Sequence, residues 1–192
     1  MPGNASESKT ELRRQVRALL ERLDATGRGA ASAHVCELLK KQDVWNRAQS
    51  VLFYAPLPEE LDIWPLTREA LAAGKIVGLL RFDSFQHSYA ACRIRNTDND
   101  LRAGRYGIRE PNEHCPALPL RQLDLILVPG MAFDLQGRRL GRGKGIYDRL
   151  LSLVRGETCG VAFDEQIVPE VPIEPHDLPV KSVLTPTRWV KC

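Results

Sequence analysis

The stretch Leu123-Asp-Leu-Ile-Leu-Val-Pro-Gly130 is the clearest secondary-structure signal in the chain. Residues 123–128 form a continuous apolar run that is interrupted only by Asp124 and closed by Pro129-Gly130. Such runs are typical of a parallel strand covered by helices on both faces, whereas a strand with one wet face alternates between apolar and polar residues. This segment therefore predicts an α/β fold.

Strand and helix signals alternate on both sides of this run. Short apolar segments predict strands at residues 51–54, 76–80, 89–94, 160–163 and 182–184. Helical spacing and capping signals predict helices that begin near Ser8 and that span residues 30–41, 65–73 and 146–154, with a break at Gly27 to Gly29 and a long loop over residues 105–119. The expected architecture is a three-layer α/β/α sandwich with a mostly parallel sheet. It forms a single domain over residues 1–192, in which residues 1–8 are a flexible N-terminus.

Composition narrows the class of protein. The 192 residues are 43% hydrophobic, which suffices for one domain with a sizeable core. The net charge of +3 comes without a run of Lys and Arg, and no segment of about 18 apolar residues is present, so we expect neither a nucleic-acid nor a membrane partner. No secretory or transit signal is evident. We expect a cytoplasmic monomer.

Cysteine and histidine show no metal-binding spacing. The five cysteines are scattered without a Cys-x-x-Cys pair, and we interpret them as free thiols in a reducing compartment. The histidines are interpreted as ordinary surface or core residues: His34, His87, His114 and His176.

A glycine-rich basic segment lies between residues 134 and 148. Gly141, Gly143 and Gly145 alternate with Arg142 and Lys144 just before the helix expected at residue 146. Glycines let backbone amides approach an anion closely, and a helix N-terminus adds a favourable dipole, so a triphosphate is the predicted ligand. The spacing matches neither the P-loop nor the dinucleotide-binding Gly-x-Gly-x-x-Gly pattern.

Each candidate residue also has a purely structural interpretation. The loop is compatible with a solvated turn, because turns collect glycine and arginine. Asp148 is compatible either with a magnesium ligand or with an ordinary carboxylate near a helix start. Lys9 and Arg13 are spaced to share one helix face, which by itself indicates solvent exposure. A tyrosine at helical spacing, such as Tyr147, is compatible with packing.

Residues 123–134, Gly137 and residues 139–148 together resemble the signature of the 5-formyltetrahydrofolate cyclo-ligase family, also called methenyltetrahydrofolate synthetase. Similar motifs occur elsewhere in the expected order: Lys9-x-x-Leu12-Arg13, Tyr54 with Glu60 and Asp62, Gly74-Lys75, Gly107-Ile-Arg-Glu110-Pro111 and His176-Asp177. The resemblance covers nearly the whole chain from about Lys9. It implies a Rossmann-like sheet similar to that of the coenzyme A transferases.

The resemblance implies a role for each matching residue. ATP would be bound by Lys9, Arg13 and the loop residues Arg139, Leu140, Gly141, Arg142, Gly143, Lys144, Gly145, Ile146 and Tyr147. The folate would contact Leu57, Glu60, Arg142, Lys144, Gly145 and Ile146. Arg142, Lys144 and Tyr147 are the catalytic candidates. Asp148 and Asp177 match the aspartates that hold Mg²⁺ in the family.

The implied reaction converts 5-formyltetrahydrofolate and ATP into 5,10-methenyltetrahydrofolate, ADP and phosphate through a phosphorylated formyl group. Two departures from the family pattern, Ile146 in place of an aromatic residue and Lys181 in place of an acidic one, leave open a catalytically weakened relative that binds folate or nucleotide. A small basic nucleic-acid-binding protein is a second alternative. Against this alternative, the chain lacks the aromatic residues that nucleic-acid-binding surfaces interleave with basic ones.

Overall fold

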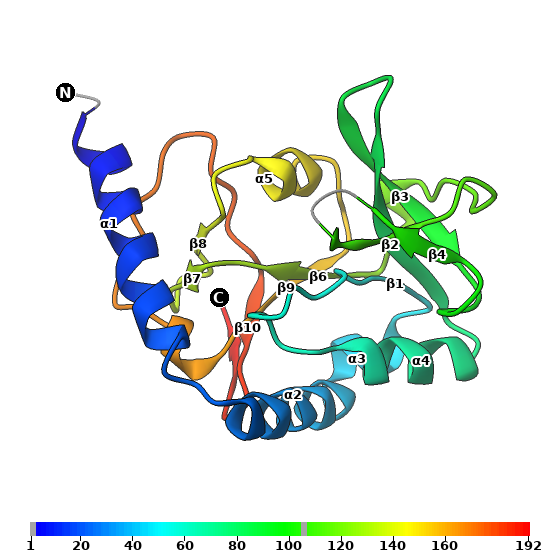
Figure 1. Ribbon diagram of the computed structural model, residues 1–192, viewed down its shortest axis with the longest axis horizontal. Coiled ribbons are helices and arrows are strands. Elements are labelled where there is room, and N and C mark those ends of the chain that lie inside the picture. The colour runs from blue at the N-terminus through cyan, green and yellow to red at the C-terminus, as the bar shows by residue number, and fades with distance from the viewer. Residues whose placement is uncertain (1–2, 105–106) are drawn as a thin grey trace.

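The apolar run forms the central strand of one sheet. In the computed structural model, which describes residues 3–104 and 107–192, this strand is β6, Leu125–Pro129 (Figure 1). It belongs to a seven-stranded sheet with the order β11-β10-β9-β6-β1-β2-β3. The inner five strands are parallel, and the edge strands β3 and β11 are antiparallel, which confirms the mostly parallel prediction. The other strands of this sheet are β1 Ser50–Leu52, β2 Ile76–Asp83, β3 Ser88–Ile94, β9 Glu157–Val161, β10 Ser182–Leu184 and β11 Trp189–Lys191.

Helices cover both faces of the sheet. Side chains on a strand alternate between its faces, and on β6 Leu125 and Leu127 pack into one apolar cluster while Ile126 and Val128 pack into another. The first cluster includes side chains of α2 and α4, and the second includes those of α5, which lies across the sheet from them (Figure 1). These four side chains of β6 are fully buried, and burial of each contributes about 1.5–3 kcal/mol. The helices are α2 Ala25–Lys40, α3 Asp43–Arg47, α4 Trp64–Ala72 and α5 Ile146–Leu151.

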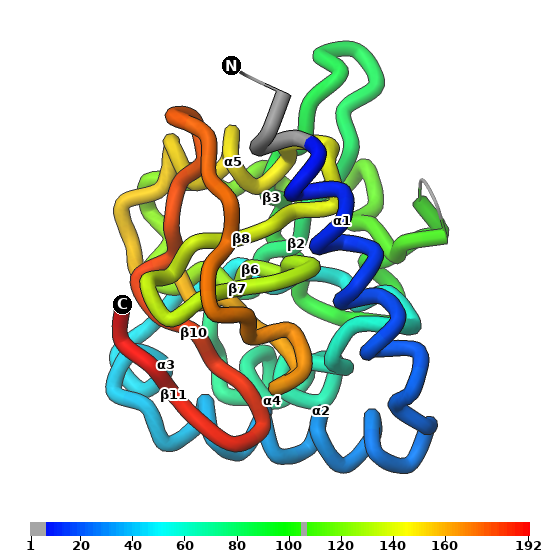
Figure 2. Tube along the Cα trace, turned by 90° about the vertical axis from the view of Figure 1, so that its left-hand side faces the viewer, coloured from blue at the N-terminus to red at the C-terminus, as the bar shows by residue number. Residues whose placement is uncertain are grey.

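The N-terminal helix flanks the sheet. Helix α1, Gly3–Leu20, begins before the predicted start at Ser8, so the segment expected to be a flexible N-terminus is helical from Gly3. Val16 and Leu20 bury its apolar stripe in the larger core cluster. Figure 2 shows α1 beside β7, Ala132–Phe133, which it contacts together with the short 3-10 helix Asp164–Gln166.

Helix α2 begins at Ala25, and the predicted break at Gly27 to Gly29 is wrong. The side chain of Asp24 caps the helix, since its Oδ1 accepts a hydrogen bond of 2.6 Å from the amide of Gly27. An aspartate cap stabilises a helix by about 1 kcal/mol, which offsets roughly the cost of one glycine in the first turn.

The predicted long loop contains a strand. Within residues 105–119, β5 Arg109–Pro111 pairs with β4 Leu101–Ala103, and Cys92 forms an isolated bridge with Ala117; residues 105 and 106 lie outside the described part of the chain. Three-residue strands are too short for a visible alternation. The remaining elements are β8 Arg139–Leu140, which pairs with β7, and the 3-10 helix Leu120–Gln122. None of the described helices is long and apolar enough to cross a membrane.

Candidate active site

A pocket of about 360 Å³ opens at the carboxyl ends of β1 and β6. Pockets in open α/β sheets form preferentially at this edge, and the volume suits a small molecule. Ten residues predicted from the sequence line it: Leu57, Glu60, Arg139, Gly141, Arg142, Lys144, Gly145, Ile146, Tyr147 and Asp148. The other five candidate residues do not line it: Lys9, Arg13, Leu140, Gly143 and Asp177. Of these, Leu140 is buried in the core.

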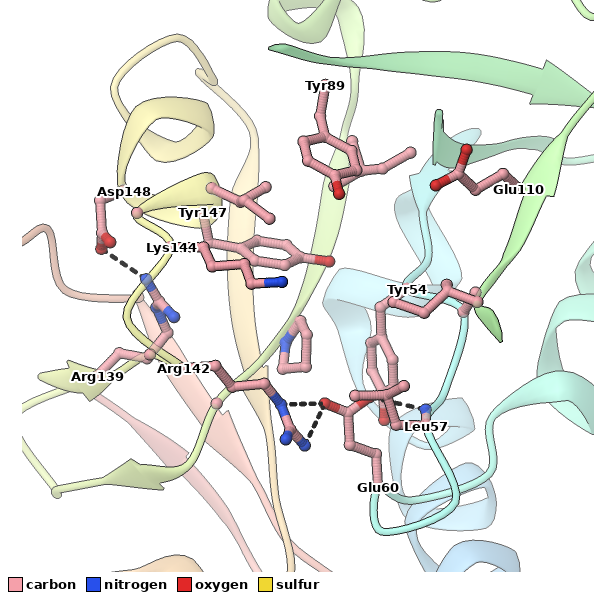
Figure 3. Close-up of a pocket in the computed structure, with 18 residues that line it drawn as sticks. Tyr54, Leu57, Glu60, Tyr89, Glu110, Arg139, Arg142, Lys144, Tyr147 and Asp148 are labelled. Atoms are coloured by element: carbon pink, nitrogen blue, oxygen red, sulfur yellow. Dashed lines mark hydrogen bonds and ion pairs between the residues drawn. The ribbon is translucent and has the colours of Figure 1, made fainter. Parts of the chain in front are cut away.

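Glu60 is the carboxylate that the β1 side of the pocket presents. Its Oε2 accepts a hydrogen bond of 3.0 Å from the amide of Leu57, and its Oε1 accepts bonds of 3.2 and 3.0 Å from Nε and Nη2 of Arg142 (Figure 3). Arg142 also reaches Glu59, with 2.9 Å between Nη1 and Oε1. Burial raises the pKa of Glu60, although the Leu57 amide and Arg142 oppose the shift. Arg142 therefore bridges from the glycine loop to the Glu59–Glu60 turn.

Arg139 and Asp148 form the ion pair on the opposite side of the pocket. Nη2 of Arg139 lies 2.5 Å from Oδ1 of Asp148 (Figure 3), and the Arg139 side chain is only 3% exposed. The guanidinium also stacks 5.7 Å from the ring centre of Tyr147, while its buried Nε has no hydrogen-bond partner among the described atoms. The pair fixes the start of α5 against β8.

The glycine loop joins β8 to α5. Gly143 and Gly145 have φ values of 93° and 60°, the left-handed region that residues with a Cβ rarely adopt, and Gly145 is the N-cap of α5. Arg13 of α1 donates from Nε to the carbonyl oxygen of Gly141 over 2.9 Å. The first helix thus places a cation against the loop.

Lys9 lies one helical turn before Arg13 and contacts a C-terminal acidic pair. Its Nζ is 2.6 Å from Oε2 of Glu174 and 2.6 Å from Oδ2 of Asp177. Burial alone would raise the pKa of Asp177, but Lys9 and the Glu174 amide hold it below its usual value. The two predicted magnesium ligands are therefore paired with different cations, Asp177 with Lys9 and Asp148 with Arg139.

Two aromatic side chains that the sequence did not assign to the site, Tyr54 and Tyr89, line the pocket together with the predicted Tyr147. Tyr54 donates from its hydroxyl to the Leu61 carbonyl oxygen over 3.0 Å. Burial raises the pKa of both Tyr54 and Tyr147, so both stay neutral phenols. The other unassigned lining residues are Ala55, Leu80, Ile108, Glu110, Pro129 and Gly130. Glu110 belongs to the motif Gly107-Ile-Arg-Glu110-Pro111 noted in the sequence.

The two departures from the family pattern lie in different places. Ile146 lines the pocket, so it shapes the cavity directly. Lys181 does not line it, and its Nζ bonds to the Gly156 carbonyl oxygen at 2.9 Å and to Glu157 at 3.3 Å. The substitution at residue 181 therefore leaves the pocket walls unchanged.

The mostly parallel sheet and the pocket at its carboxyl edge define an α/β enzyme of small-molecule metabolism. A sequence profile described as the 5-formyltetrahydrofolate cyclo-ligase family matches residues 5–186. The chain belongs to this family.

Relatives from bacteria and animals agree with this assignment. The 5-formyltetrahydrofolate cyclo-ligase of Escherichia coli K12 is 34% identical over 145 residues, covering 73% of this chain and 80% of the relative. The mouse 5-formyltetrahydrofolate cyclo-ligase is 28% identical over 190 residues, covering 93% and 94%. The solution structure of the Aquifex aeolicus 5,10-methenyltetrahydrofolate synthetase superimposes with a TM-score of 0.86 at 34% identity, over 95% of this chain and 92% of that one.

Proposed function

We propose that this chain catalyses the ATP-dependent conversion of 5-formyltetrahydrofolate to 5,10-methenyltetrahydrofolate, with release of ADP and phosphate. The observation that carries the proposal is the arrangement of one pocket: a buried carboxylate, Glu60, on one wall and the glycine loop with Arg142 and Lys144 on the other. A folate and a phosphate donor must meet in this reaction, and the pocket offers a group for each.

Glu60 and the tyrosines suit the pterin ring. A pterin presents N–H and amino donors along one edge, and a carboxylate accepts from two such donors at once. The backbone amide of Leu57 holds the Glu60 carboxylate in place at 3.0 Å. Tyr54 and Tyr89 line the same cavity with flat apolar surface for a planar ring.

The glycine loop and the first helix suit the triphosphate. Arg13 of α1 contacts the loop through its bond to the Gly141 carbonyl oxygen, and Lys9, one turn earlier on the same helix, contacts Glu174 and Asp177. Arg139, Arg142 and Lys144 bring three further cationic side chains to the pocket lining. In phosphoryl transfer the protein contributes mainly positioning and charge stabilisation, which this set of cations and loop amides supplies.

The chemistry explains why ATP is required. The formyl oxygen attacks the γ-phosphorus of ATP, ADP leaves, and the formyl carbon becomes an imidate phosphate. N10 then attacks that carbon, its proton is released, and the C–O bond breaks with loss of inorganic phosphate. A formamide oxygen is a poor leaving group and phosphate is a good one, so phosphorylation drives the ring closure. Arg142 and Lys144 would neutralise charge on the transferred phosphoryl group.

Asp148 and Asp177 are the residues that would hold a magnesium ion accompanying ATP. Asp148 lines the pocket and Asp177 lies beside Lys9, and carboxylate oxygens are the hard donors that Mg²⁺ prefers. Each carboxylate is paired with a cation in the structure, Asp148 with Arg139 and Asp177 with Lys9, so a bound ion would take the place of that contact. Held by these carboxylates, the ion would supply positive charge that neutralises part of the charge of the ATP phosphates. The cytoplasmic location and the monomeric state stay predictions.

Absorbance tests the proposal directly. Purified protein is mixed with 5-formyltetrahydrofolate, Mg²⁺ and ATP, and the near-ultraviolet band of the methenyl product is followed beside a control without ATP. We expect growth of the band only with ATP. Binding of both ligands without growth would instead support the catalytically weakened relative that Ile146 suggested.

A further inference from the structure

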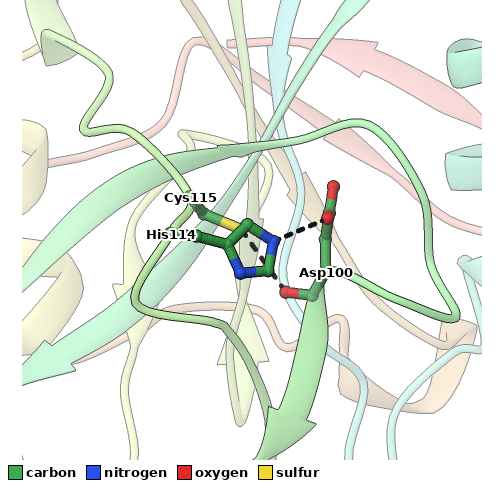
Figure 4. Close-up of side chains that lie close together, drawn as sticks. All are labelled: Asp100, His114 and Cys115. Atoms are coloured by element: carbon green, nitrogen blue, oxygen red, sulfur yellow. Dashed lines mark hydrogen bonds and ion pairs between the residues drawn. The ribbon is translucent and has the colours of Figure 1, made fainter.

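Three potential metal ligands of different chemistry meet outside the pocket. Asp100 precedes β4, and His114 and Cys115 follow β5, so the two turns meet at the base of the β4–β5 hairpin (Figure 4). One donor atom from each residue, a carboxylate oxygen, an imidazole nitrogen and a thiol sulfur, lies within 4.8 Å of the other two. The family assignment gives no role to these three residues.

Backbone hydrogen bonds hold the Asp100 carboxylate in place. Oδ2 of Asp100 accepts bonds of 2.6 Å from the Arg95 amide and 3.1 Å from the Asn96 amide. Its other oxygen, Oδ1, is directed at Nε2 of His114 at 2.9 Å. Metal-binding carboxylates are commonly oriented by hydrogen bonds of this kind.

The second turn is fastened to the first. The Asn112 amide donates to the Asp100 carbonyl oxygen over 2.7 Å, and Sγ of Cys115 lies 3.5 Å from the same oxygen. The Cys115 side chain is buried, while 64% of the His114 side chain is exposed. The buried thiol and fixed carboxylate form the floor of the cluster, and the exposed imidazole leaves a path from solvent.

We propose that Asp100, His114 and Cys115 bind a zinc ion, with a water molecule as the fourth ligand. Mixed oxygen, nitrogen and sulfur donors favour zinc, whereas magnesium prefers oxygen alone. Zinc bonds of about 2.0–2.3 Å in a tetrahedral site place donors about 3.3–3.8 Å apart. The carboxylate and imidazole need to separate slightly from 2.9 Å, and the ion takes the place of the proton between them.

The location gives the ion a consequence for the pocket. The hairpin that follows Asp100 and precedes His114 contributes Ile108 and Glu110 to the pocket lining. An ion that joins the two ends of this hairpin restricts its motion relative to the sheet. Zinc binding therefore stabilises the fold, and it does so whether or not the proposed reaction takes place.

Cobalt(II) is the probe for the thiolate ligand. Reduced, metal-free protein is titrated with Co²⁺, which occupies zinc sites and gives a near-ultraviolet charge-transfer band when a thiolate binds it. We expect the band to saturate at one equivalent and to disappear when Zn²⁺ is added. His114→Gln, at an exposed position, should weaken binding by at least about tenfold. Cys115→Ser should abolish the band.

Two controls separate this site from other metal ligands. Cys192→Ser removes the exposed thiol and should leave the band and affinity unchanged. The oxygen and nitrogen cluster of Glu174, His176 and Asp177 contains no thiol, so binding there gives no charge-transfer band. Absence of the band in the wild type, or an unchanged affinity in His114→Gln, would overturn the proposal. In thermal unfolding, Zn²⁺ should raise the Tm of the wild type by more than that of His114→Gln.

Discussion

Arg139 donates to Asp148 over 2.5 Å, nine positions along the chain, and the guanidinium is almost completely buried. The contact spans the whole glycine loop, since Arg139 lies in β8 and Asp148 in α5. Asp148 therefore has a structural task in addition to the magnesium role proposed for it.

Replacing Asp148 should affect stability as well as turnover. Asp148→Ala leaves a buried guanidinium without its carboxylate, which we expect to lower the free energy of unfolding by at least about 2 kcal/mol. Asp148→Asn keeps an oxygen acceptor for Arg139 and should cost less. Urea unfolding compares the two variants, and equal stabilities would contradict the structural task. Turnover should fall at least about tenfold in both.

Lys144→Ala should lower turnover without unfolding the protein. The change removes a cation from the loop where the phosphoryl group is proposed to move, and we expect a loss of at least about tenfold in kcat. Arg155→Ala removes an exposed cation beyond α5 and serves as the matched control. Circular dichroism checks the fold. Activity in Lys144→Ala equal to that of the control would remove Lys144 from the catalytic set.

Protonation of Glu60 should produce an acidic limb in the pH profile of kcat/KM for 5-formyltetrahydrofolate. Burial raises the pKa of this carboxyl, so protonation begins at a higher pH than for an exposed glutamate. The neutral acid loses one acceptor for the pterin donors, and kcat/KM for 5-formyltetrahydrofolate should fall as the pH drops through that pKa. Glu60→Gln should have a lower kcat/KM and lack the limb. A limb that persists unchanged in Glu60→Gln would assign it to another group.

Asp177 should stabilise the fold at neutral pH and cease to do so in acid. Its pKa is held below the unfolded value of about 3.9 because Lys9 outweighs the effect of burial. A depressed folded pKa gives stability that is present above the unfolded pKa and is lost as the pH falls through the folded pKa. The Tm difference between wild type and Asp177→Asn should thus shrink in acid. A difference independent of pH would argue against this ion pair.

The proposed intermediate predicts the fate of one oxygen atom. If the formyl oxygen attacks phosphorus, ¹⁸O placed in the formyl group of the substrate must appear in inorganic phosphate. Direct condensation without phosphorylation would release the label as water. Mass spectrometry of the phosphate distinguishes the two routes, and unlabelled phosphate formed with normal turnover would rule out the intermediate.

The sequence predicted the centre of the fold because its signals there are local. The apolar run of β6 is buried on both faces, and the alternation of Leu125 and Ile126 between two clusters follows from strand geometry alone. The spacing of Gly141, Gly143 and Gly145 identified the loop that borders the pocket. The start of α2 was missed because one side-chain bond, from the Gly27 amide to Asp24, overrides the glycine signal.

Contacts between distant segments could not be predicted from the sequence. The bond from Arg13 to the Gly141 carbonyl oxygen joins residues 128 positions apart, and no local pattern encodes it. The sequence predicted Tyr89 only as part of a strand, whereas in the structure the pairing of β2 with β3 places it at the pocket. The pairing of Asp148 with Arg139 and of Asp177 with Lys9 likewise depends on how the loops pack.

We expect the bridge between Arg142 and Glu60 to couple the binding of the two proposed substrates. The same bond occupies the cation proposed for phosphate and the carboxylate proposed for the pterin, so whichever ligand binds first must break it. The side chain that binds the second ligand, Arg142 or Glu60, is then already free of the bridge. Binding of ATP and of folate should therefore be cooperative, each raising the affinity for the other by the same factor.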